Sequence, residues 1–170
     1  ENEYGWWRIE GGKVNFDYYG IAENEYGWWK IEGGKVNFDY TGLADSDNGR
    51  MYVSNGGVDF GYTNVIQDGD VWVYVENGKV RYDYTGIREN ANGWWKIESG
   101  IVNFKFTGIA SNENGEFYIK DGKVDFDYSG TINQSDCIYT VKSGWVVSKE
   151  GISGIIKGVD VSHHNNDNGE

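Results

Sequence analysis

The sequence predicts an all-β protein, an elongated solenoid of stacked β-hairpins, from three observations. A segment of 22 residues repeats, and residues 1–22 and 23–44 are identical at 19 of 22 positions. A turn-forming dipeptide that ends in glycine stands at the same place in every copy, as at 11–12 and 33–34. The residues after it, 13–18, alternate between polar and apolar side chains, which is the pattern of a half-buried strand.

The repeat divides the chain into two predicted parts. A hairpin array spans 1–148, and 149–170 is predicted to form a linker followed by the first strand of a truncated second domain. The array consists of six full copies, 1–22, 23–44, 45–66, 67–88, 89–110 and 111–132, and a degenerate seventh copy, 133–148.

Each copy is predicted to form one hairpin around its glycine dipeptide. In the first copy the two strands are residues 6–10 and 13–18, and the turn is 11–12. Gly20 is expected to end the second strand, and the acidic, Asn-rich segment 23–27 to lead into the next hairpin. A lone hairpin is marginally stable in water, so we expect successive hairpins to stack into a continuous core.

Positions that stay apolar in every copy define the predicted core. The site of Val14 is Val in all seven copies, and that of Ile9 is Ile or Val throughout. The site of Trp7 is apolar in each copy, and that of Phe16 is aromatic in the first six. Together with Tyr18 and its equivalents, these side chains are predicted to face inward.

The composition excludes several classes of function. The chain has 27 Asp and Glu against 15 Lys and Arg, a net charge of −12, which disfavours nucleic acid and anionic lipid as partners. No apolar run approaches the roughly 20 residues of a membrane span. Cys137 is the one cysteine, and His163 and His164 are the two histidines, so we expect no metal site and no cofactor. Casual calcium binding in the loop 45–49 stays open.

Tryptophan at one repeat position is the best candidate for ligand contact. This position lies on the opposite face of its strand from Trp7 and also accepts Arg50 and Glu116, so it is not a conventional core site. Indole faces attract sugar rings or cationic head groups. The alternative is that each indole packs against the neighbouring hairpin or loop. The predicted ligand-binding residues are Trp6, Trp28, Trp72 and Trp94.

The repeated carboxylates are not predicted to be catalytic. Asp17 and Glu10 recur in several copies at equivalent positions, and a pair of carboxylates can act as a glycosidase acid and base. Catalysis needs one desolvated constellation, however, and the repeat offers several similar ones. Solvated strand faces and cross-strand partners for lysine explain the same pattern.

The repeat resembles the cell-wall-binding repeats of secreted Gram-positive proteins, similar in plan to choline-binding and glucan- or toxin-receptor-binding repeats. The resemblance rests on the motif Gly-Trp-Trp-Lys-Ile-Glu-Gly-Gly-Lys-Val-Asn-Phe-Asp-Tyr-Thr-Gly at 27–42 and covers about 1–148. It departs where choline-type repeats carry Trp-Tyr-Tyr and this chain has Val-Asn-Phe-Asp-Tyr. The resemblance implies a secreted, wall-associated binding module whose partner is a cell-wall polysaccharide, peptidoglycan or a teichoic-acid substituent.

A second resemblance lies in the tail. Residues 156–165, Ile-Lys-Gly-Val-Asp-Val-Ser-His-His-Asn, resemble the first strand of family-25 glycoside hydrolases, which are lysozyme-like muramidases. That resemblance implies an active-site role for Asp160 and a domain cut short within its first βα unit, so that this fragment is not itself an enzyme. A plain linker or capping strand is the alternative.

These observations predict a non-catalytic module that targets an attached muramidase to the bacterial cell wall. Two alternatives remain open at this point. One is an adhesin- or toxin-like array that binds a host glycan or protein, and the other is a passive spacer.

Overall fold

The computed structural model describes residues 1–152 and confirms the all-β prediction of stacked hairpins in a 22-residue pattern. The chain divides into two compact units, residues 1–103 and residue 104 onward, and each is described by itself. Asp160 and the rest of the predicted hydrolase strand lie outside the described residues. Among the residues that are described, no helix is long and apolar enough to cross a bilayer.

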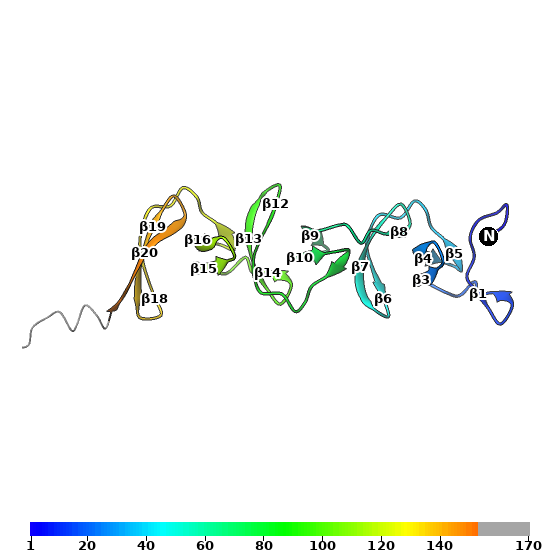
Figure 1. Ribbon diagram of the computed structural model, residues 1–170. Coiled ribbons are helices and arrows are strands. Elements are labelled where there is room, and N and C mark those ends of the chain that lie inside the picture. The colour runs from blue at the N-terminus through cyan, green and yellow to red at the C-terminus, as the bar shows by residue number, and fades with distance from the viewer. Residues whose placement is uncertain (153–170) are drawn as a thin grey trace, which may run out of the picture. The chain divides into compact units, whose positions relative to one another are not determined.

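The structural unit is a long two-stranded hairpin followed by a short third strand (Figure 1). The first strands are β3 (Gly20–Asn24), β6 (Gly42–Ser46), β9 (Asn64–Asp68), β12 (Gly86–Asn90), β15 (Gly108–Asn112) and β18 (Gly130–Gln134). The second strands are β4 (Gly27–Glu32), β7 (Gly49–Ser54), β10 (Val71–Glu76), β13 (Gly93–Glu98), β16 (Gly115–Lys120) and β19 (Cys137–Lys142). The short strands are β5 (Lys35–Val36), β8 (Gly57–Val58), β11 (Lys79–Val80), β14 (Ile101–Val102) and β17 (Lys123–Val124).

The two ends of the described chain depart from this unit. At the N-terminal end, β1 (Ile9–Glu10) pairs with β2 (Lys13–Val14) in a two-stranded ladder. At the other end, β20 (Trp145–Gly151) is long and pairs with β19 along six residues, with a bulge between Thr140 and Val141.

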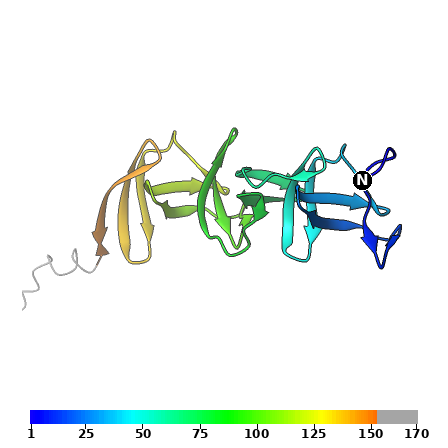
Figure 2. The same cartoon turned by 45° about the vertical axis from the view of Figure 1, so that its right-hand side comes forward.

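The long hairpin crosses the boundary between two sequence copies, which corrects the predicted strand arrangement. In β3–β4 the pairing runs from Gly20↔Ile31 to Asn24↔Gly27, so the tight turn is the acidic segment expected to be a connection. Its side-chain amide supports the turn, because the Asn24 carbonyl oxygen Oδ1 accepts a hydrogen bond from the Tyr26 N–H at 2.9 Å. The long β6–β7 hairpin of the next copy is clear in cyan in Figure 2.

The glycine dipeptide instead joins the hairpin to a strand of two residues, not six. In the second copy β5 ends at Val36, because Asn37 turns the chain: its Oδ1 accepts the backbone N–H of Asp39 at 3.0 Å. The Phe16 site therefore lies on a turn and is exposed, whereas we predicted it in the core. These exposed aromatics are Phe16, Phe38, Phe60, Tyr82, Phe104 and Phe126.

The other predicted core sites are buried in most copies, although Trp7 and Trp29 are only half-buried. Ile and Val at the Ile9 site are almost fully buried in the later copies, and Ile9 itself is the exposed exception. The Tyr18 site is half-buried, and its hydroxyl donates to the carbonyl three residues ahead, at 2.9 Å from Tyr18 to Ile21. The buried residues at the Ile9, Val14 and Trp7 sites are Ile31, Val53, Val75, Ile97, Ile119, Val141, Val36, Val80, Val102, Val124, Met51, Val73, Trp95, Phe117 and Tyr139.

Consecutive copies are joined through the glycine turn. The Gly56 N–H donates to the Tyr40 carbonyl of the preceding copy at 2.9 Å, and the Gly56 carbonyl accepts from the Lys30 N–H at 2.8 Å. The neighbouring Asn55 N–H donates to the Thr41 hydroxyl at 3.1 Å. The same three bonds recur at the turns 77–78 and 99–100, and at 143–144 in the second unit with a serine hydroxyl. Each turn is therefore fixed to the copy before it.

The second glycine of the turn is required by this contact as well as by its positive φ. A Cβ atom on Gly78 (φ +75°) would lie 2.4 Å from the carbonyl oxygen of Asp59 in the preceding copy. Gly56 and Gly100 are equally restricted, because an added Cβ would lie 2.6 Å from the Asn37 carbonyl oxygen and 2.5 Å from that of Arg81, respectively. A side chain here would separate the copies and break the hydrogen bonds between them.

Replacing Gly78 tests this requirement. Gly69 (φ +60°) is the matched control, since a Cβ there meets nothing within 4 Å. Both alanine variants carry the cost of a left-handed residue, roughly 1–2 kcal/mol. Only Gly78→Ala adds a backbone clash, so we expect it to lower the free energy of unfolding by a further ~1–3 kcal/mol in urea titrations. Equal destabilisation by the two substitutions would contradict the account of stacking.

Candidate functional site

Three aromatic rings from two consecutive copies meet at steep angles between hairpins. Trp6 precedes β1, Trp29 lies on β4, and Phe38 lies on the turn after β5. The ring centroids of Trp6 and Trp29 are 4.9 Å apart at 71°, and those of Trp6 and Phe38 are 5.7 Å apart at 80°. Trp29 and Phe38 are 5.8 Å apart at 68°. We call Trp6, Trp29 and Phe38 the aromatic corner.

The hairpin turn holds one indole of the aromatic corner in a fixed orientation. The Trp29 Nε1–H donates to Oδ1 of Asn24, at the end of β3, at 2.9 Å. Since that oxygen also stabilises the turn, the ring position and the turn are coupled. The same bond orients Trp95, which donates to Asn90 at 2.9 Å. The indole N–H is satisfied within the protein, which leaves the apolar ring surface for contact.

The aromatic corner borders a pocket with a carboxylate in its lining. Trp6 and Trp29 line a cavity of about 200 Å³ together with Glu23, whose side chain is exposed. Arg8 also lines it, but its guanidinium pairs with Glu10 at 3.0 Å and lies 5.0 Å over the ring of Tyr18. Glu23 is therefore the one carboxylate among the residues that line this pocket, and the cation beside it already has partners of its own.

The predicted tryptophans are both packed and accessible. Trp6, Trp28, Trp72 and Trp94 are all half-buried. Trp28 meets Phe60 edge-on at 6.0 Å and 90° and packs against the cluster that contains Met51 and Val53. Trp72 lies 5.2 Å from Trp95 at 54°. Indole packing onto the neighbouring copy is a fact of the structure, and the ligand-binding role of these residues stays a prediction.

Sequence reasoning missed two members of the aromatic corner by placing both in the core. Trp29 was assigned to the buried face and Phe38 to an inward-facing strand, whereas Phe38 is 43% exposed. One signal pointed to Phe38: an aromatic follows an Asn or Asp in five of six copies, and in the second copy that Asn turns the chain. The contact between Trp6 and Trp29 joins different copies, and no local pattern indicates it.

A second series of rings is already occupied by cations of the chain itself. The Lys30 Nζ lies 5.3 Å over the Tyr40 ring, as Arg8 does over Tyr18 in the first copy. In the third copy a tyrosine replaces the cation, and Tyr52 stacks on Tyr62 at 3.6 Å and 11°. Because cations or stacked rings fill these positions, the aromatic corner is the better candidate for an external ligand.

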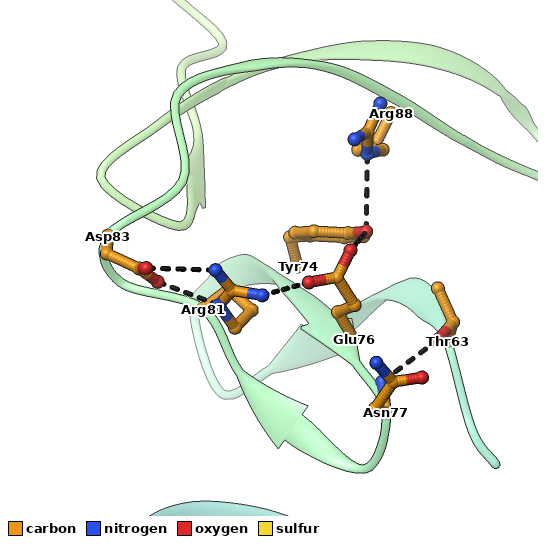
Figure 3. A network of polar contacts seen from close by, with 7 residues as sticks. All are labelled: Thr63, Tyr74, Glu76, Asn77, Arg81, Asp83 and Arg88. Carbon is orange, nitrogen blue, oxygen red and sulfur yellow. Dashed lines mark hydrogen bonds and ion pairs between the residues drawn. The ribbon is translucent and has the colours of Figure 1, made fainter.

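Figure 3 shows the polar network around Tyr74, whose ring lies 4.9 Å from that of Tyr84, the member of the second series in this copy. Arg88 lies 4.4 Å over the ring of Tyr84, and its Nε donates to the Tyr74 hydroxyl at 3.2 Å. The Tyr74 hydroxyl in turn donates to Glu76 at 2.9 Å, and burial raises the pKa of Tyr74. Arg81 bonds both Glu76 and Asp83, and its hydrogen bonds lower the pKa of Asp83 to about 2.

Repeated carboxylates form bonds within their own copies. Glu10 and Glu32 each accept the side-chain amide of an asparagine five residues ahead, at 2.7 and 2.9 Å. Those hydrogen bonds lower the pKa of both carboxyls, with smaller contributions from Arg8 and Lys30. In the part of the chain that the structure describes, no group of three or more His, Cys, Asp or Glu side chains converges as a metal site would.

Truncating one tryptophan tests its packing role. We expect Trp28→Ala to lower the free energy of unfolding by roughly 1–3 kcal/mol, because half of the indole is withdrawn from water. Trp28→Phe should retain most of that stability. Urea unfolding followed by far-UV circular dichroism measures both, and an unchanged midpoint in Trp28→Ala would show that the indole contributes nothing to folding.

Comparison with family models places the repeat in a known family. The family described as "Choline-binding repeat" matches residues 1–15, 17–37, 39–59, 61–81, 83–103 and 105–125. From the second segment on, each match encloses one complete hairpin and short strand, the unit seen in the structure.

Among solved structures, the chain is similar to choline binding protein F from Streptococcus pneumoniae, at 20% identity and a TM-score of 0.34. The match covers 80% of this chain and 43% of that one. Comparison with curated protein sequences gives no match. Because the repeat matches cover more than half of its length, the chain belongs to the choline-binding repeat family.

Proposed function

We propose that this chain is a non-catalytic module that binds choline groups carried by teichoic acids of a bacterial cell wall. The observation that carries the proposal is the aromatic corner, with Trp6 and Trp29 lining a pocket that also contains Glu23. The repeat family supports the same ligand.

The chemistry of a quaternary ammonium group matches this site. Such a cation has no N–H to donate, so it is recognised by aromatic faces and by nearby negative charge rather than by hydrogen bonds. In the pocket lining the rings of Trp6 and Trp29 supply apolar, electron-rich surface and Glu23 supplies the negative charge, while Phe38 packs at steep angles against both indoles. The net charge of −12 favours a cationic substituent over the bare anionic polymer.

Several weak sites would act together on a polymer. Trp72 and Trp95 repeat the pairing of Trp6 and Trp29, at a centroid distance of 5.2 Å, and Glu89 stands at the position of Glu23. A cation–π contact contributes about 0.5–2 kcal/mol, so a single site is expected to bind weakly. Linked sites on one chain raise the avidity for a polymer that displays the ligand many times.

Delivery of a hydrolase is the finer part of the proposal. The resemblance of residues 156–165 to family-25 glycoside hydrolases supports a parent protein that is a secreted muramidase, with Asp160 in its active site. Extending the chain beyond residue 170 with its native sequence tests this idea. The longer protein should release soluble fragments from choline-bearing walls, and Asp160→Asn should abolish release without changing wall binding. Unchanged hydrolysis by Asp160→Asn would remove the assignment.

The affinities for choline and for its uncharged carbon analogue, 3,3-dimethylbutan-1-ol, distinguish a site that recognises a cation from a site that is only apolar. We expect choline to shift the indole ¹H–¹⁵N signals of Trp6 and Trp29 in a saturable titration, and the neutral analogue to bind roughly tenfold more weakly. Trp6→Ala should remove the choline response of Trp29 and leave that of Trp95. Tyr4→Ala, which removes an exposed ring outside the aromatic corner, is the control and should change neither.

Three outcomes would contradict the proposal. Equal binding of choline and the neutral analogue would show that charge is irrelevant. If glucose oligomers bind and choline does not, the same tryptophans would form a sugar-binding site. An absence of any shift, with far-UV circular dichroism confirming the fold, would favour a spacer.

A further inference from the structure

One interface between copies lacks the aromatic corner and contains ion pairs in its place. At the Trp6 position, β7 carries Arg50, and at the Trp29 position, β10 carries Val73. The Arg50 guanidinium donates to both carboxylate oxygens of Asp68 on β9, each at 2.7 Å, and to Asp45 on β6 at 2.8 Å. These side chains join the β6–β7 hairpin to the β9–β10 hairpin.

We propose that Arg50 is a built-in cation that replaces the ligand's ammonium group at this interface, so that the β6–β7 and β9–β10 hairpins are held together without ligand. The inference rests on the proposed function, because it assigns which interfaces take choline and which do not.

The residues around Arg50 differ from the aromatic corner in a coordinated way. The counterpart of Glu23 at this interface is Gln67, which carries no charge, whereas Asp45, from the same copy as Arg50, binds the guanidinium. Asp68 stands at the position of Asn24, which orients Trp29 through its indole N–H. Since the Val73 side chain has no N–H that needs an acceptor, a carboxylate can stand at the Asn24 position, and it binds Arg50. Three changes, Trp to Arg, Trp to Val and Asn to Asp, therefore act together.

The ion pair has the geometry of a strong one. It is bidentate, with about a quarter of the Arg50 side chain and 22% of the Asp68 side chain exposed. The hydrogen bonds that Arg50 donates to Asp68, and to a smaller extent the one that it donates to Asp45, raise the pKa of Arg50. Arg50 thus supplies at this interface the positive charge that the ligand would bring to the aromatic corner, and its partners lie on two consecutive hairpins.

The consequence is a division of ligand-binding interfaces. The pairs Trp6–Trp29 and Trp72–Trp95 lie on opposite sides of the Arg50 interface in the sequence. We expect choline to stabilise the hairpins at those pairs and to leave the Arg50 interface unchanged.

Arg50→Met removes the charge and retains the length of the side chain. Arg81→Met is the matched control, because Arg81 pairs with Glu76 and Asp83 inside a single copy. Without choline, we expect Arg50→Met to accelerate hydrogen exchange of the Asn64–Asp68 amides by roughly tenfold and Arg81→Met to leave it nearly unchanged. Asp68→Asn should have the effect of Arg50→Met, and the double variant should add little.

Choline provides the second readout in the unaltered chain. Saturating choline should slow exchange in Gly20–Asn24 and in Gly86–Asn90 several-fold. The effect on Asn64–Asp68 should be clearly smaller, because β9 pairs with the Trp72 strand but its Asp68 binds Arg50 in place of a ligand. Two results would overturn the inference: no acceleration by Arg50→Met beyond the control, or choline protection of Asn64–Asp68 equal to that of Gly20–Asn24. If choline slows exchange in none of the segments, the proposed function is contradicted. If Arg50→Met leaves exchange in Asn64–Asp68 unchanged, only the role of Arg50 as a built-in cation is contradicted.

Discussion

The second glycine of each tight turn brings its backbone against a carbonyl group of the preceding copy, at a distance that leaves no room for a Cβ atom. A Cβ atom on Gly78 would lie 2.4 Å from the Asp59 carbonyl oxygen. The backbone N–H and carbonyl of Gly78 also form hydrogen bonds with two residues of the copy before it. A hairpin of this size cannot bury enough apolar surface alone. Its neighbour supplies the missing surface, and the glycine contact sets how closely the two approach.

The proposed ligand site depends on the same close approach of the two copies. Trp6 and Trp29 belong to different copies, and their rings are 4.9 Å apart because the copies are held at that spacing. The side chains that complete the core and those proposed to bind the ligand are therefore neighbours in one interface. Trp28, for example, packs against both Phe60 and the cluster that contains Met51 and Val53. Where the rings are absent, at Arg50, ion pairs connect the hairpins through the same strand positions.

The repeat period, the all-β class and the core of Ile and Val were predictable because the sequence pattern that indicates each of them recurs in every copy. The phase of the hairpin was not, since one copy contains two turn signals of similar strength. The Gly-Gly turn and the Asn24 turn both suit a hairpin, and the side-chain bond from Asn37 to the Asp39 N–H shortens the strand that alternation predicted. The alternation of polar and apolar side chains over 13–18 fits a six-residue strand. It fits a two-residue strand followed by a turn equally well.

The candidate site was predictable only in part, for a related reason. The sequence singled out Trp6 because its position tolerates Arg and Glu, and that inference needed one strand alone. Trp29 and Phe38 join the aromatic corner through the arrangement of one copy on the next, which no local pattern encodes. The bond between Arg50 and Asp68 spans 18 residues and has the same origin.

A crystal structure of the chain grown with choline tests the account most directly. The account predicts density for the ammonium group within about 6 Å of the ring centroids of Trp6 and Trp29, and an unchanged ion pair between Arg50 and Asp68. Choline bound on an isolated exposed ring away from the interface between copies, or bound beside Arg50 with that ion pair broken, would contradict it.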